Sequence, residues 1–394
     1  MSTKTNDSFT ARQSISRLST NKRPLAFLQK WRRIVDLAIL LMLLPVVFWA
    51  AILPERTLFP AIWLLGCLVL FYLARALARN SARLRWMVYG LLFGGLVLAI
   101  TSPLSVNAWN PGVLPKSFLE GYQTTVYQAT GLLTNFLVNP NDLSGALLLI
   151  FPLAMGLLVF NFRGSGWVHK LFYLTVVVSL GVVLVILRGQ GAWAGLLGAV
   201  SLLLILRWRW WGLAAVLAGA GLAWAALHFH WSSVLEAFTV HEFWQDVNER
   251  RELWRRGIFI VQDFPFTGIG LGNYPEVVQR MYPVYERTAS QHAHNLFLQI
   301  AVDLGLPGLL AWLVVFSGGI FFSWRDYRFG ARSKDGWLKG LGAGLLASQL
   351  GLIVYGMVDA PYWGIYLGTA LFWFTSGLTI GTADMLTLVL NSPG

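Results

Sequence analysis

Charged residues are scarce in this sequence: they make up 12% of its 394 residues, whereas hydrophobic residues make up 56%. Soluble domains carry about 25% charged residues, so this composition argues against an ordinary soluble domain. Apolar runs recur along the chain, and a helix of about 20 apolar residues crosses a hydrocarbon core of about 30 Å. The composition therefore predicts an all-α, polytopic membrane protein.

Cysteine is nearly absent as well. The one cysteine, Cys67, lies within an apolar run, which leaves no partner for a disulfide and no cysteine-based metal site. Acidic residues are also few, since 18 Asp and Glu stand against 30 Lys and Arg, for a formal net charge of +12. No nucleic-acid-binding motif accompanies this charge, and we predict no nucleic-acid partner.

The basic residues instead predict how the chain is oriented. Short cytoplasmic loops collect Lys and Arg, and most of the basic residues fall in the N-terminal tail and between alternate pairs of apolar runs. This pattern predicts about ten transmembrane helices, with both termini in the cytoplasm and one large extracytoplasmic loop. The predicted spans are 34–53, 57–78, 86–106, 142–160, 169–187, 190–206, 211–228, 307–323, 338–358 and 362–382.

Four segments follow from this topology. Residues 1–33 are predicted to be a disordered basic cytoplasmic tail, because they are polar and too long for the first region of a cleaved signal peptide. Residues 34–228 hold the N-terminal membrane helices, and 229–306 form the extracytoplasmic loop, with short helices and the candidate site. Residues 307–394 hold the C-terminal membrane helices.

Two histidines stand at the end of the large loop, in "QHAHN" (291–295). On a helix His292 and His294 would point to nearly opposite faces, a poor arrangement for a shared metal. If a helix begins at His294 or Asn295, its N-terminal dipole disfavours a charged imidazole. A neutral imidazole can accept a proton and serve as a general base. The alternative is an interfacial His–Asn cap with no catalytic role.

The apolar run that follows, 294–323, is too long for one straight span. A continuous helix would measure about 45 Å, but "GLPG" (305–308) contains Pro307, which removes a backbone donor and clashes with the preceding turn. We predict a short outer helix over 294–304 and a spanning helix from about 307. The break would bring Asp303 near the interface, where a carboxylate is unremarkable.

An arginine-rich stretch, "NERRELWRRGIF" (248–259), precedes the histidines in the same loop. It holds Arg250, Arg251, Arg255 and Arg256 around Trp254. Guanidinium groups bind phosphate oxygens bidentately and stay charged at any working pH. The alternative is an amphipathic helix that lies on anionic headgroups with Trp254 as its anchor.

A glycine-rich stretch, "GIGLGNY" (268–274), follows Pro265. It lacks the flanking strand of a nucleotide-binding loop and is predicted to be a tight turn, whose amides could also form an anion nest. The outer loop thus combines arginines, a turn and a candidate base beside lipid. This set suits a substrate with a phosphate head, a lipid tail and a nucleophile to deprotonate.

Taken together, these motifs resemble the O-antigen ligase and polymerase superfamily of bacterial membrane glycosyltransferases, over roughly 135–325. The superfamily's pattern of His, then Asn, Ser or Gln, then Gly-x-x-Gly is met by His294, Asn295, Gly305 and Gly308. Its R-x-E-L-W and G-x-G-x-G-N motifs resemble 250–254 and 268–273, and "NPNDLSGALLLIFPLA" (139–154) is similar to its Asn-Pro-Asn helix start.

The resemblance implies metal-independent, inverting glycosyl transfer in the bacterial inner membrane. The donor would be a glycan on undecaprenyl diphosphate, and the acceptor a hydroxyl on a lipid-linked or other sugar. It implies His294 as the base and Arg250 as the group that holds the leaving diphosphate. The candidate substrate-binding residues are Arg251, Arg188, His292, Asn295, Gln190 and Arg255, and no metal or cofactor is expected.

One departure concerns "LRGQGAW" (187–193), where members often carry S-R-G-A-W. Gln190 stands in the place of the family's arginine, and Arg188 is the candidate to replace it.

A branch of the same superfamily is described as bicarbonate transport proteins, which would use the arginines to attract an anion. A non-catalytic partner in envelope-glycan assembly is the third interpretation. The lack of an internal repeat and of charges deep in the spans disfavours a transporter.

Overall fold

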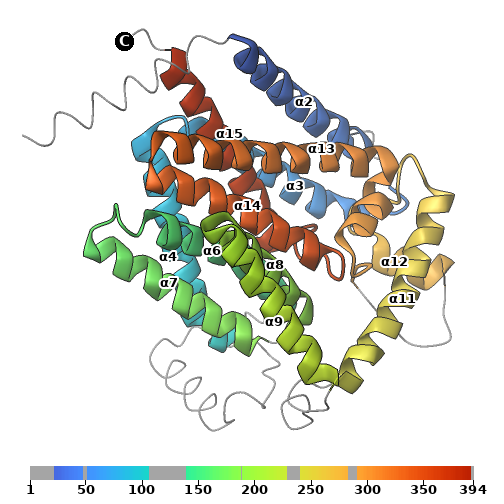
Figure 1. Ribbon diagram of the computed structural model, residues 1–394. Coiled ribbons are helices and arrows are strands. Elements are labelled where there is room, and N and C mark those ends of the chain that lie inside the picture. The colour runs from blue at the N-terminus through green and yellow to red at the C-terminus, as the bar shows by residue number, and fades with distance from the viewer. Residues whose placement is uncertain are drawn as a thin grey trace, which may run out of the picture.

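A computed structural model describes residues 22–47, 51–105, 139–187, 189–228, 240–282 and 291–391. These residues form helices and no strands (Figure 1), which confirms the all-α prediction. The helices are α2 (Lys22–Val47), α3 (Pro54–Leu77), α4 (Ser81–Ser105), α6 (Pro140–Asn161), α7 (Trp167–Ile186), α8 (Gln190–Trp208), α9 (Trp210–His228), α11 (Val240–Asp263), α12 (Tyr274–Met281), α13 (Leu296–Ser333), α14 (Gly336–Gly356) and α15 (Leu367–Asn391).

Within the described ranges, 7 helices are long and apolar enough to cross a membrane, namely α3, α4, α6, α7, α8, α13 and α14. The chain is therefore a multi-pass membrane protein. Helices α2, α9 and α15 overlap the other three predicted spans but are not among these seven. The total of ten spans, and the side of the membrane on which each loop lies, remain predictions.

Two of the predicted non-membrane segments need comment. Residues 22–33, expected in the tail, are the first turns of α2. They are held to α15 by an ion pair between Arg32 Nε and Asp384 Oδ1 at 2.6 Å, and Trp31 stacks on Phe321 of α13. Most of the loop expected over 107–141 falls outside the described residues.

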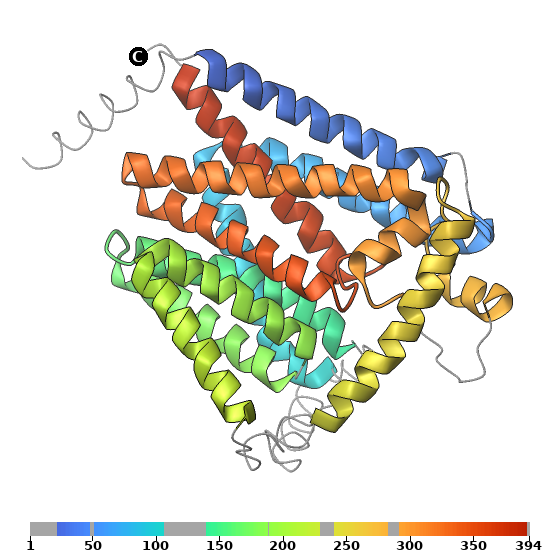
Figure 2. The same cartoon turned by 45° about the vertical axis from the view of Figure 1, so that its right-hand side comes forward.

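Helices α6, α8, α13 and α14 pack side by side in the middle of the bundle (Figures 1 and 2). The interface of α6 and α14 is close, since a Cβ on Gly156 would lie 2.6 Å from the carbonyl oxygen of Gly340. Small residues allow such close approach between membrane helices. Helix α11 lies at one end of the bundle, and the N-terminal end of α2 and the C-terminal end of α15 lie at the other (Figure 2).

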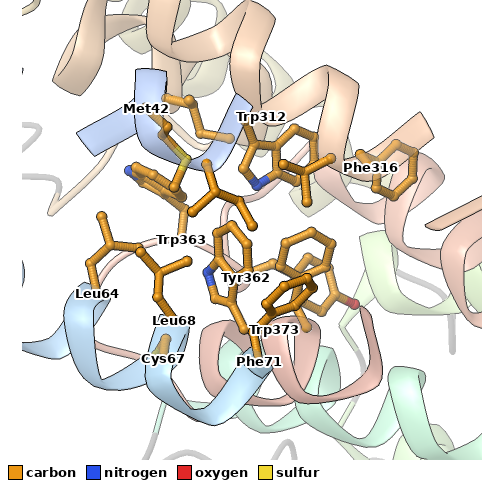
Figure 3. Packing of buried hydrophobic residues seen from close by; sticks show 14 of the residues in the cluster. Met42, Leu64, Cys67, Leu68, Phe71, Trp312, Phe316, Tyr362, Trp363 and Trp373 are labelled. Carbon is orange, nitrogen blue, oxygen red and sulfur yellow. The ribbon is translucent and has the colours of Figure 1, made fainter. Parts of the chain in front are cut away.

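The largest buried cluster joins α2, α3, α13, α15 and the segment before α15 (Figure 3). Trp312, Phe316 and Phe372 stack on one another, with ring centroids 5.1 to 6.4 Å apart. Trp363 and Leu64 belong to the same cluster. This packing fixes the start of α15 against α3, and so fixes the short loop that connects α14 to α15.

Helix α13 contains the break that the sequence predicts. Gly305 has φ 71° and ψ 178°, so a short helix before it and a longer one after it meet at a kink. The amide of Leu306 donates to the carbonyl of Pro265 at 2.7 Å, which couples the kink to the loop after α11. The predicted break between a short helix and a longer one is confirmed, whereas the outer position of the short helix stays a prediction.

Candidate functional site

The candidate site lies where α11, the start of α13 and the end of α14 meet. Asn295 caps α13, because its side chain accepts a hydrogen bond from the amide of Leu298 at 2.9 Å. His294 therefore lies just outside the helix, which begins at Leu296, two residues after the first residue of the predicted helix 294–304. Its φ is +46°, a left-handed conformation that is uncommon for a residue with a side chain.

This backbone conformation brings the two histidines together. Their ring centroids are 4.3 Å apart, and the amide of His294 donates to Nδ1 of His292 at 3.2 Å. The expectation that the rings face apart was wrong because it assumed a helix, and residues 291–294 are not helical.

Both rings contact Asp359, which follows the end of α14. Nδ1 of His294 lies 3.1 Å from Oδ1 of Asp359, and Nε2 of His292 lies 3.7 Å from the same oxygen. Asp359 is 3% exposed. Burial by itself would raise the pKa of Asp359, but His294, His292 and the amide of Ala360 outweigh it, so the pKa lies below its usual value. The two histidines and this amide thus favour the ionised carboxylate of Asp359 over the neutral acid.

Burial has the opposite consequence for His292. It lowers the pKa of His292 from 6.5 to about 4, against the attraction of Asp359, and His294 and Arg250 add to the lowering. His292 is therefore neutral at pH 7. Its Nδ1 can therefore accept the hydrogen bond from the backbone amide of His294.

Helix α11 brings an arginine to the same place. Nη1 of Arg250 donates to the carbonyl of Val358 at 2.6 Å, and one turn later Nε1 of Trp254 donates to the carbonyl of His294 at 3.1 Å. Asn295 donates to the carbonyl of Met357 at 2.9 Å. The segment 357–359 is therefore tied to α11 and to the start of α13.

Sequence reasoning missed Asp359. The only signal available was a carboxylate in the very short loop between two apolar spans, in "VDAPYW" (358–363). Asp142 was missed for a similar reason: it lies in the first turn of α6, where the capping residue Asn139 and Pro140 start the helix. Asp142 interacts electrostatically with Asp359 and with His294, so the "NPND" segment belongs to this site.

The other predicted arginines lie elsewhere on α11. The side chains of Arg251 and Arg255 are exposed, and Arg255 lies over the ring of Phe259 at 5.5 Å. Arg256 is buried and lies 3.6 Å from Glu252. Gln190 is the first residue of α8, but its side chain, like the whole of Arg188, lies outside the described residues.

The glycine-rich turn supports the site without lining it. Gly268, Gly270 and Gly272 have positive φ, and a Cβ on Gly268 would meet the carbonyl of Asp303 at 2.5 Å. The amides of Ile269 and Gly270 donate to the carbonyls of Val302 and Asp303. Because these two amides already have protein partners, the turn fixes α13 rather than offering them to an anion.

Asp303 is more than an interfacial carboxylate. It is 3% exposed and accepts hydrogen bonds from Nε2 of Gln299 and Nε1 of Trp363, each at 2.9 Å. Gln299 in turn accepts from the amide of Ala293 at 2.8 Å. The expectation that Asp303 is unremarkable was wrong, because its carboxylate is buried and accepts a hydrogen bond from Trp363, in the segment before α15.

The two histidines and Asp359 could also hold a cation. One potential ligand atom from each lies within 4.8 Å of the others, and two imidazoles with a carboxylate form a common ligand set for transition metals. The prediction that the chain has no metal site rested on helical spacing of the histidines, which the structure does not have.

No curated protein matches this chain. A protein-family model described as O-antigen ligase matches residues 174–313, a stretch that includes Arg250, His292, His294 and Asn295, whereas Asp142 and Asp359 lie outside it. The chain thus carries an O-antigen ligase domain over these residues, and the resemblance to the O-antigen ligase superfamily is confirmed.

Proposed function

We propose that this protein transfers a glycan from undecaprenyl diphosphate to a hydroxyl of a lipid-linked or other sugar, with inversion and without a metal. The reaction takes place at the outer face of the bacterial inner membrane. The observation that carries this proposal is the contact of His294 with Asp359, one residue from the carbonyl that Arg250 binds.

His294 acts as the general base. Its Nδ1 faces Asp359, which leaves Nε2 to take the proton of the acceptor hydroxyl. A carboxylate next to Nδ1 fixes the ring's tautomer and stabilises the imidazolium that forms. The deprotonated oxygen then forms a bond to the anomeric carbon as the bond from that carbon to the diphosphate oxygen breaks.

Arg250 stabilises the leaving group, since the electron pair of the broken bond stays on undecaprenyl diphosphate. A guanidinium held beforehand in a water-poor site stabilises such developing charge without reorganisation. Arg250 is half-buried and is held in place by its hydrogen bond to the carbonyl of Val358. His292 and Asn295 orient the base, and Arg188 or Arg251 assists at the diphosphate.

The direct test is transfer by the purified protein in detergent or proteoliposomes. The donor is a lipid-diphosphate glycan and the acceptor a lipid-linked glycan, with no added metal. Mass spectrometry should detect the joined glycan together with an equal amount of free undecaprenyl diphosphate. Absence of both products, with uptake of labelled bicarbonate into the same proteoliposomes, would instead favour the transport interpretation.

A further inference from the structure

A cavity of about 340 Å³ lies beside the histidines, between α3, the loop before α12 and the start of α15. Small-molecule sites usually measure roughly 300–1,000 Å³, so the cavity suits a small ligand rather than a chain of sugars. His292 forms part of its wall, whereas Arg250 and His294 do not line it. The site described above does not account for it.

Aromatic side chains form much of the cavity wall. Phe59 and Trp63 line the cavity from α3. Trp363 and Tyr366 line it from the segment before α15. Trp363 is held by its hydrogen bond to Asp303 and by the packed cluster that also contains Leu64 (Figure 3). Rigid aromatic faces of this kind suit ligands with a flat apolar face.

Fixed polar groups are set among these rings. Gln299 and Asp303 line the cavity, and both are held by the hydrogen bonds that link the amide of Ala293, Gln299, Asp303 and Trp363. A carboxylate oxygen can accept more than one hydrogen bond. The carboxylate of Asp303 is therefore able to accept from a ligand hydroxyl as well.

Two further polar atoms, which belong to residues that line the cavity, are buried and have no hydrogen-bond partner among the described residues. They are Nε1 of Trp63 and Oγ1 of Thr369, and Thr369 is 1% exposed. Leaving a buried donor or acceptor unpaired is unfavourable. A ligand that carries both hydroxyls and an apolar face would satisfy these atoms and cover the rings, and a sugar ring has both.

We propose that this cavity binds the acceptor sugar of the reaction, an inference that rests on the proposed function. The ring lies against the tryptophans, its hydroxyls bond to Thr369 and Asp303, and the reacting hydroxyl is directed past His292 toward His294. In an inverting displacement the base and the leaving group act on opposite faces of the sugar that is transferred. The acceptor therefore belongs away from Arg250, and Arg250 does not line this cavity.

The first experiment measures sugar binding without any transfer. Saturation-transfer NMR on the purified protein uses methyl glycosides of glucose, galactose, mannose and N-acetylglucosamine as probes. At least one probe should give ring-proton signals with the wild type, and Thr369→Val should reduce them by more than half. Thr369→Ser, which keeps the hydroxyl, should restore them. The matched control is Thr379→Val on the same helix, because the Thr379 hydroxyl bonds only to its own helix, at Thr375.

The second experiment separates this inference from the proposed function. In the transfer assay, Thr369→Val should raise the KM for the acceptor about tenfold and leave the KM for the donor unchanged. If no probe binds the wild type, or if Thr369→Val binds probe and acceptor as the wild type does, the inference is wrong even when transfer proceeds. If the probes bind as expected but no transfer occurs, the cavity is a sugar site and the proposed function is wrong.

Discussion

Nδ1 of His294 lies 3.1 Å from Oδ1 of Asp359. The two residues are far apart in the sequence, since His294 precedes α13 and Asp359 follows α14. The contact depends on the left-handed backbone at His294 and on hydrogen bonds that hold segment 357–359 from two other residues, Asn295 and Arg250. The proposed base and the carboxylate beside it are thus brought together by three separate elements. The predictions below test what each part contributes.

Replacing Asp359 with Asn should lower kcat about 100-fold or more and change the KM values little. The amide keeps the size of the side chain but no longer stabilises the imidazolium, and it can favour the wrong tautomer. Transfer kinetics of the purified variant measure this effect. Asp335→Asn is the control, since Asp335 caps α14 at the amide of Leu338 and Asn caps helices equally well. Equal loss in both variants would point to misfolding.

Arg250→Lys should reduce kcat/KM for the donor roughly 100-fold, because an ammonium does not reproduce the two-pronged contact of a guanidinium with phosphate. The matched control is Arg280→Lys on α12, which is exposed and paired with Glu276. The measurement is the initial rate against donor concentration. A rate for Arg250→Lys within threefold of the wild type would contradict the assigned role.

The stability of the protein should fall as the pH decreases from 6.5 to about 4, in part because of His292. Its pKa is about 4 in the folded state against 6.5 otherwise, so the unfolded chain binds a proton in this range and the folded chain does not. The effect amounts to at most about 3 kcal/mol. His292→Gln should flatten the decrease in denaturation temperature measured in detergent between these pH values. A decrease as steep as that of the wild type would show that other groups cause it.

Chelators should leave the transfer rate unchanged, and Zn²⁺ should inhibit it. The ligand atoms of His292, His294 and Asp359 lie close enough to hold an ion, and an ion on His294 would occupy the base. Rates with EDTA and with micromolar Zn²⁺ measure both effects. Loss of transfer in EDTA that a divalent ion restores would overturn metal independence.

Gly305→Ala should destabilise the protein by about 2 kcal/mol or more, because the position combines a φ of 71° with backbone atoms of Phe266 at 2.6 Å from a Cβ. The denaturation temperature in detergent measures this loss. Gly66→Ala is the control, because a Cβ there meets nothing within 4 Å and alanine favours a helix.

Local sequence features predicted much of this architecture. The break in α13 followed from Pro307 and the length of the apolar run, because both are local properties of the chain. Contacts between distant segments were beyond the same reasoning. Asp359 reaches the histidines only through the folding of α14 against α13, and the partner of Asp303, Trp363, lies 60 residues further along the chain.

The closeness of His292 and His294 could not be predicted for another reason. Their spacing implies opposite faces on any helix, and only the φ of +46° at His294 brings the rings together. Nothing in "QHAHN" marks that conformation, since only a small minority of non-glycine residues adopt a positive φ.

The central claim is that His294 takes the proton of the acceptor. Its most direct test is a single-turnover measurement with purified His294→Ala and a saturating lipid-diphosphate glycan donor, across pH 5 to 9. The account predicts that donor binding persists and that the transfer rate falls at least 1,000-fold at every pH in this range. Transfer by His294→Ala at a rate near that of the wild type, with the same pH dependence, would contradict it.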